Sequence, residues 1–164
     1  MNTTLEPAVR ETSDDGTREW SSPSTVDQQF IDMLDAFRPS GGLVPQAEVV
    51  QWLEKHRGPG AAQLQDWIGR RLVLCLRWQS QLWLPWFQFN RASCTPHVQL
   101  RTVLNELNAV HAPWEACRWF TLPNPWLGHR RPVNVLLHDL SGVLDAAHAD
   151  RLIANGHVPW DRPD

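Results

Sequence analysis

The sequence lacks several features that would assign it to a class of protein. It has no tyrosine, and no stretch reaches the roughly 18 consecutive apolar residues of a membrane-spanning helix. The opening residues MNTTLEPAVRETSDDG contain no apolar run of the kind that exports a chain. Three cysteines, Cys75, Cys94 and Cys117, are an odd number, which does not favour a disulfide framework. We therefore expect a cytoplasmic protein that does not bind membranes.

Motifs for catalysis are also missing. The chain has no nucleophile elbow, phosphate-binding loop or glycine-rich dinucleotide turn. Cys94, His97, His111 and Cys117 have the side chains of a zinc site. However, His97 and His111 lie near opposite ends of one predicted helix, about 20 Å apart by helical rise. We therefore predict that the protein is not an enzyme and holds neither a cofactor nor a metal ion.

Ten tryptophans contrast with the absence of tyrosine. Hydrophobic residues make up 42% of the chain, so large indole rings supply much of the volume of a folded core. The net charge of −3 is unevenly distributed. Residues 1–39 carry three basic and eight acidic side chains, residues 40–90 carry five and three, and residues 91–164 carry seven of each. Only the middle of the chain is basic.

Hydrophobic spacing and turn residues predict a mainly α-helical protein with a small β-hairpin. Residues 1–24 are polar and acidic, and we expect them to form a disordered tail. Residues 25–92 form a helix-turn-helix-like module that includes the hairpin. Residues 93–156 are expected to form a C-terminal helical bundle, and residues 157–164 an extended tail.

The helix-turn-helix-like module is expected to begin with a helix that Thr25 caps. Two short helices follow, at about Pro45–His56 and Ala61–Arg70, with a glycine-containing turn between them. Two apolar segments follow, and the polar residues Gln79-Ser80-Gln81 between them predict a β-hairpin. Pro85 predicts that the second segment is an edge strand, because proline cannot donate to a strand ladder.

Four helices are predicted in the bundle. The first is capped by Thr95 and ends near Val110, and the second opens at Pro113. The third covers about Pro132–Leu140, and the last begins near Ser141. Their apolar residues recur at helical spacing, which predicts that one face of each helix is buried.

The segment Trp119–Leu137 reads WFTLPNPWLGHRRPVNVLL and predicts a sharp corner. Asn124 can cap a short helical turn that Pro125 begins. Gly128 can take the positive φ that closes this turn. Pro132 then opens the next helix, where its missing N–H costs nothing.

This corner resembles the C-terminal toxin-binding domain of the Xre/MbcA/ParS antitoxins. The signature of that family is a Trp-Leu pair, a Pro-Asn pair, Leu-Gly-Gly-Arg-Thr-Pro and an apolar helix. The matching residues are Trp119, Pro123, Asn124, Leu127, Gly128, Arg130, Pro132, Leu136 and Leu137. Three positions differ: His129 replaces the second glycine, Arg131 the capping threonine and Asn134 an acidic residue, which weakens the capping box. Upstream, the PWFQF segment at residues 85–89 is similar to the Pro-aromatic-Phe-Gln-Phe strand of the family.

The resemblance implies that residues 93–156 are a toxin-binding domain and that the chain is a bacterial antitoxin. In that family the partner is often a RES-domain toxin that degrades NAD, and a segment near the antitoxin's end blocks the toxin's active site. Carried over to this chain, the partner-binding residues are Asn124, Trp126, Arg130, Arg131, Arg151, Asn155, His157 and Trp160. We also expect a homodimer that can regulate its own operon.

Two other hypotheses stay open. One is a transcriptional regulator that binds operator DNA through the helix pair, with amides reading adenine and arginines meeting phosphate or guanine. Its DNA-binding residues would be Gln63, Gln65, Arg70 and Arg71. The module's net charge of about +2 would neutralise few phosphates. The other is an orphan interaction protein that keeps the fold without a toxin.

Overall fold

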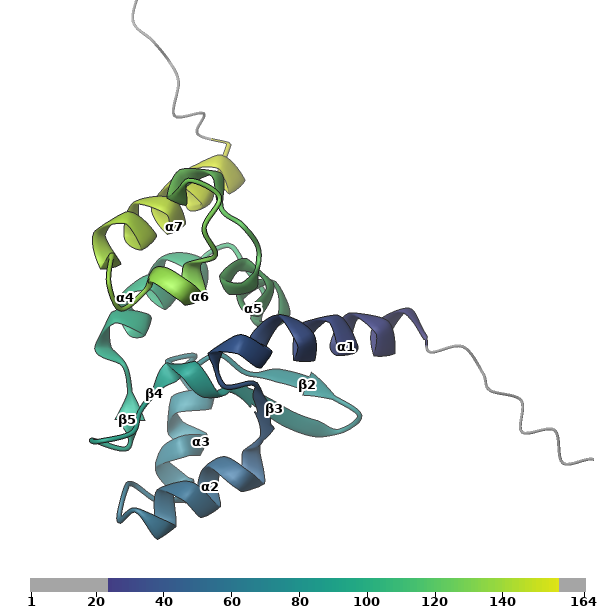
Figure 1. The fold of residues 1–164 in the computed structure, drawn as a ribbon, viewed down its shortest axis with the longest axis vertical. Coiled ribbons are helices and arrows are strands. Elements are labelled where there is room, and N and C mark those ends of the chain that lie inside the picture. The colour runs from purple at the N-terminus through teal and green to yellow at the C-terminus, as the bar shows by residue number, and fades with distance from the viewer. Residues whose placement is uncertain (1–23, 157–164) are drawn as a thin grey trace, which may run out of the picture.

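The computed structural model describes residues 24–156 (Figure 1). Over this part the protein has seven α-helices, a three-stranded antiparallel sheet and a separate pair of short antiparallel strands, so the predicted fold class, mainly α with a small hairpin, is confirmed. The predicted acidic tail, apart from Ser24, and the predicted C-terminal tail lie outside the described residues. Each helix in residues 24–156 is too short or too polar to span a bilayer.

The first half of the chain contains the predicted helix pair. Its elements are α1 (Thr25–Phe37), η1 (Arg38–Ser40), β1 (Leu43–Pro45), α2 (Gln46–Lys55), α3 (Ala61–Gly69), β2 (Leu76–Trp78), β3 (Gln81–Pro85) and η2 (Trp86–Gln88). The cap of α1 is Ser24 and not Thr25. The Ser24 hydroxyl oxygen accepts a hydrogen bond from the Asp27 backbone N–H at 3.1 Å, which satisfies a donor in the first turn.

The hairpin forms as predicted, with Gln79 and Ser80 both at positive φ in its two-residue turn. The prediction that Pro85 marks an edge strand is wrong. Strand β3 is central in the order β1-β3-β2, and Pro85 lies at its end opposite Leu43 of β1. Strand β1, the helices α2 and α3 and the hairpin β2–β3 therefore form one module around a three-stranded antiparallel sheet.

The second half begins with two short strands and continues as helices. Its elements are β4 (Phe89–Asn90), β5 (Thr95–Pro96), α4 (Val98–Leu107), α5 (Pro113–Thr121), η3 (Pro125–Leu127), α6 (Pro132–Val135) and α7 (Leu140–Ala154). The prediction that Thr95 caps α4 is wrong, because Thr95 pairs with Asn90 in a strand and His97 precedes the helix. Helix α6 is shorter than predicted. The chain turns there to start α7, whose cap Asp139 accepts from the Gly142 N–H at 3.0 Å.

Two hydrophobic clusters fill the interior. The larger joins α1 to the C-terminal helices and includes Phe30, Phe37, Leu104, Phe120 and Ala147. The smaller lies among α2, α3 and β3. In Figure 1, α1 lies between the C-terminal helices above and the sheet below. The larger core therefore crosses the domain boundary predicted between residues 92 and 93.

Gln88 is the largest polar side chain among the fully buried residues, with 0% exposure. Its Oε1 accepts from the Leu74 N–H at 2.7 Å, and its Nε2 donates to the Leu74 carbonyl oxygen at 3.0 Å. The side-chain amide of Gln88 therefore pairs with the N–H and C=O of Leu74, as the backbone of a neighbouring strand would. This is the structural role of the glutamine in the PWFQF segment.

We expect Gln88→Leu to lower the free energy of unfolding by about 3 kcal/mol. The substitution leaves the buried N–H and C=O of Leu74 without partners. Urea denaturation measures the change. Gln81→Leu, at an exposed position of the same sheet, is the control and should change stability by less than about 0.5 kcal/mol. A similar effect of the two substitutions would contradict this role of Gln88.

Candidate partner-binding site

The corner between α5 and α7 is built around Asn124, whose side chain is 6% exposed. Its Oδ1 accepts from the Trp126 N–H at 2.9 Å, which confirms the predicted cap of η3. Its backbone N–H donates to the Arg130 carbonyl oxygen at 3.0 Å, and its own carbonyl oxygen accepts from the N–H of His129 at 2.9 Å. Asn124 therefore holds the corner together from inside and presents little surface to a partner.

The other predicted residues of the corner differ in their surroundings. The Arg130 Nε donates to the Leu127 carbonyl oxygen at 2.9 Å, and its guanidinium forms an ion pair with Asp139 at 3.3 Å. Arg131 is exposed and lines a hollow of about 380 Å³ between α1 and α5. Trp126 is 40% exposed. Trp126 and Arg131 therefore offer surface to a partner, whereas Arg130 mainly stabilises the corner.

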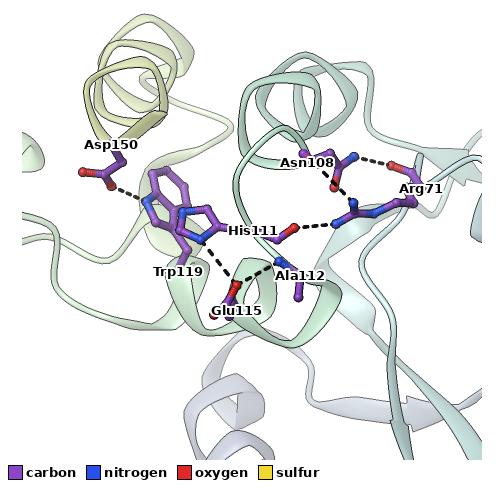
Figure 2. A network of polar contacts seen from close by, with 7 residues as sticks. All are labelled: Arg71, Asn108, His111, Ala112, Glu115, Trp119 and Asp150. Atoms are coloured by element: carbon purple, nitrogen blue, oxygen red, sulfur yellow. Dashed lines mark hydrogen bonds and ion pairs between the residues drawn. The ribbon is translucent and has the colours of Figure 1, made fainter. Parts of the chain in front are cut away.

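A groove of about 410 Å³ lies between the corner and the last turns of α7. Its apolar rim consists of three exposed side chains: Leu122 at 48%, Trp126 at 40% and Ile153 at 50%. Inside the groove, the Trp119 Nε1–H donates to Asp150 Oδ2 at 2.6 Å (Figure 2). The Asn124 side-chain amide donates to the same oxygen at 3.4 Å. These hydrogen bonds tie α5 and the corner to α7.

The predicted residues near the end of the chain are only partly described. The Arg151 guanidinium forms an ion pair with Glu106 of α4 at 3.1 Å, so this side chain ties two helices together. Asn155 is the exposed C-cap of α7. His157 and Trp160 lie outside the described residues. The structure therefore brings Asn124 and Trp126 into one groove with α7, and Asn155 is not among the residues that line that groove.

No family model, curated protein or solved structure matches this chain. The resemblance to the Xre/MbcA/ParS antitoxins therefore stays a prediction that rests on the quoted residues.

Sequence reasoning missed Leu122 and Ile153 as groove residues. Ile153 belongs to the apolar pattern of α7 and looks like a core residue, yet it lies on the exposed side of the last turn. Leu122 follows the end of α5, where periodicity no longer says which way a side chain points. Only the packing of the corner against α7 shows that the two residues share a rim.

Of the predicted DNA-binding residues, some have exposed side chains and others bind groups of the same chain. Gln63 and Gln65 are exposed on α3, and Arg70 forms an exposed ion pair with Asp66 at 3.4 Å. Arg71 is engaged within the chain. Its guanidinium donates to the carbonyl oxygens of Asn108 at 3.3 Å and His111 at 2.7 Å (Figure 2). Arg71 therefore links the end of α3 to the end of α4, and its contact with DNA stays a prediction.

Metal-ligating and nucleophilic side chains among the described residues include three free cysteines. Across residues 24–156, no three side chains of His, Cys, Asp or Glu come together as a metal-binding group. Burial raises the pKa of the Cys75 and Cys117 thiols above the ordinary value. Both therefore stay protonated at neutral pH, and a protonated thiol is a poor nucleophile.

Arg70 and Arg71 are adjacent and give a matched pair of substitutions. We expect Arg71→Ala to lower the free energy of unfolding by about 2 kcal/mol, because two carbonyl oxygens lose a charged donor. Alanine keeps the side-chain Cβ at the positive φ of 54°, so the backbone contribution is unchanged. Arg70→Ala should cost less than about 0.5 kcal/mol, as expected for an exposed ion pair. Equal costs in thermal or urea unfolding would refute the difference in role.

His129 adopts a left-handed conformation with φ of 61°, next to Gly128 with φ of 62°. We expect His129→Gly to raise the free energy of unfolding by about 0.5–1 kcal/mol, because glycine relieves the Cβ strain. Gly128→Ala is the matched opposite. A Cβ there meets no atom within 4 Å, so only backbone strain is added and stability should fall by about 1 kcal/mol. A loss of stability in His129→Gly would mean that the imidazole makes a stabilising contact.

Proposed function

We propose that this chain is an antitoxin-like protein that neutralises a partner toxin by direct binding through its C-terminal helices. The observation that carries the proposal is the groove between the corner and α7. The resemblance of the corner supplies the kind of partner, a toxin such as a NAD-degrading RES-domain protein. Regulation of its own operon would accompany this binding and is not required for it.

The groove has the properties of a protein-binding surface. Three large apolar side chains, Leu122, Trp126 and Ile153, are 40–50% exposed around one hollow. Exposed apolar residues that gather in one patch mark interaction sites more often than scattered ones. Tryptophan in particular contributes strongly to binding energy at interfaces. These three side chains would exclude water from a side chain that the partner inserts into the groove.

The floor of the groove is rigid before any partner arrives. Asp150 accepts from both Trp119 and Asn124, and Asn124 also closes the backbone of the corner. A preorganised surface loses little conformational entropy on binding. This favours neutralisation by stoichiometric binding, in which the preformed groove holds the toxin and no reaction is needed.

The helix pair gives weaker support for DNA binding. Among the four residues predicted for it, Arg71 is engaged with backbone carbonyl oxygens and Arg70 is paired with Asp66. The exposed face of α3 then offers two amides and few free cations, whereas specific DNA binding depends on contacts to phosphate. The regulator hypothesis stays second for this reason.

The test uses the full chain co-expressed with the product of the neighbouring gene. We expect a stable complex and relief of that product's toxicity. Ile153→Asp and Leu122→Asp place a carboxylate on the apolar rim and should each weaken the complex by roughly 10- to 100-fold. Both residues are about half exposed, so the fold should tolerate the change. Affinity is measured by calorimetry and neutralisation by growth.

Val98→Asp is the control, because Val98 is 67% exposed at the start of α4 and does not line the groove. It should leave affinity and neutralisation unchanged. Absence of a complex would count against the antitoxin function as a whole. A complex that resists both groove substitutions would leave the function but move the interface elsewhere.

A further inference from the structure

A second hollow, of about 640 Å³, lies on the helix-turn-helix-like module and shares no residue with the groove. Two indole rings line it, Trp52 of α2 and Trp86 of η2. Their centroids are 5.0 Å apart and their planes are inclined by 71°. The two indoles meet edge to face, so a planar ring that stacks on one of them is roughly perpendicular to the other, and both stacked and edge-to-face arrangements are favourable for aromatic groups.

The position of both indoles is fixed by the surrounding structure. The Trp86 backbone N–H donates to the Gly42 carbonyl oxygen at 2.9 Å. Gly41 has a φ of 104°, and a Cβ there would lie 3.0 Å from Trp86 Cδ1, so the glycine lets the backbone run against this ring. Phe89 packs against both indoles, with centroid distances of 6.1 and 6.0 Å. The aromatic corner is thus preorganised.

Positive charge lies beside these rings. Lys55 and Arg91 line the hollow, are exposed, and form no ion pair with another described residue. The loop that carries Arg91 is ordered by Asn90, whose Oδ1 accepts from the N–H groups of Ala92 and Ser93. Glu48 is the one acidic residue of the lining. The hollow therefore combines aromatic surfaces with two cations that are available to an anion.

We propose that this hollow binds a nucleobase that carries a phosphate. The base stacks in the corner of Trp52 and Trp86, and the phosphate lies near Lys55 and Arg91. Aromatic platforms next to cations are what single-stranded nucleic acids and nucleotides require. Bases in a duplex are already stacked and cannot enter such a corner. The ligand is therefore either a free mononucleotide or one residue of a single strand.

Calorimetry on the full chain distinguishes these two sources. The probes are adenosine monophosphate, adenosine, inorganic phosphate, and an oligothymidylate of about ten nucleotides, as a single strand or in a duplex. We expect the mononucleotide or the single strand to bind at least about tenfold more tightly than adenosine or phosphate alone. Binding of the mononucleotide as tight as that of the oligonucleotide identifies a nucleotide site. Binding of the oligonucleotide alone identifies a single-strand site.

Substitutions assign the binding to this hollow. The double variant Lys55→Ala, Arg91→Ala should weaken binding about tenfold and lower the slope of affinity against salt by about two charges. Trp52→Leu should weaken it to a similar extent through lost stacking. Glu48→Gln removes the opposing charge and should tighten binding about twofold. Arg101→Ala is the control, since Arg101 is an exposed arginine on α4 outside the hollow.

Three results would overturn the proposal. They are no binding of any probe at about 1 mM, unchanged affinity in the double charge variant, and a duplex that binds as well as the single strand. Lys55 and Arg91 are exposed, so their variant stays informative even if Trp52→Leu destabilises the smaller core.

Discussion

The hydrogen bond from the Trp119 indole to Asp150 sets the geometry of the C-terminal half. A carboxylate that is only partly exposed needs donors, and Trp119 and Asn124 supply them from α5 and the corner. The same contact therefore fixes the distance between these elements and α7. The shape of the groove, the exposure of its apolar rim and the direction of the last turn of α7 all follow from this distance.

Local sequence was sufficient to predict the structure of the corner, but it was not sufficient to predict strand β1. Pro125 and Pro132 fix their own φ, and Gly128 tolerates the positive φ that closes the turn, so the turn, its closure and the next helix start could be predicted from position alone. Strand β1 could not, since its three residues have no pattern of their own and pair with a strand some forty residues later.

The functional side chains show the same division. Asn124 was correctly predicted as a cap, but its burial and its contact with Asp150 depend on residues 26 positions away. Arg71 was predicted to face a DNA groove, and the carbonyl oxygens that it donates to lie 37 and 40 residues further along the chain. Gln88 belonged to a recognised segment, but its pairing with the Leu74 backbone required the fold. Long-range partners of polar groups leave no periodic signal in a sequence.

The shared core has an evolutionary consequence. Phe30 of α1 stacks on Trp78 of the hairpin, with ring centroids 4.2 Å apart, while α1 also packs on α5. Neither half of the chain can thus be exchanged with another protein without exposing the apolar surface that the other half covers. Recombination that shuffles intact modules would fail here. The hollow beside α2 and η2 and the groove on the C-terminal helices are therefore inherited as one unit.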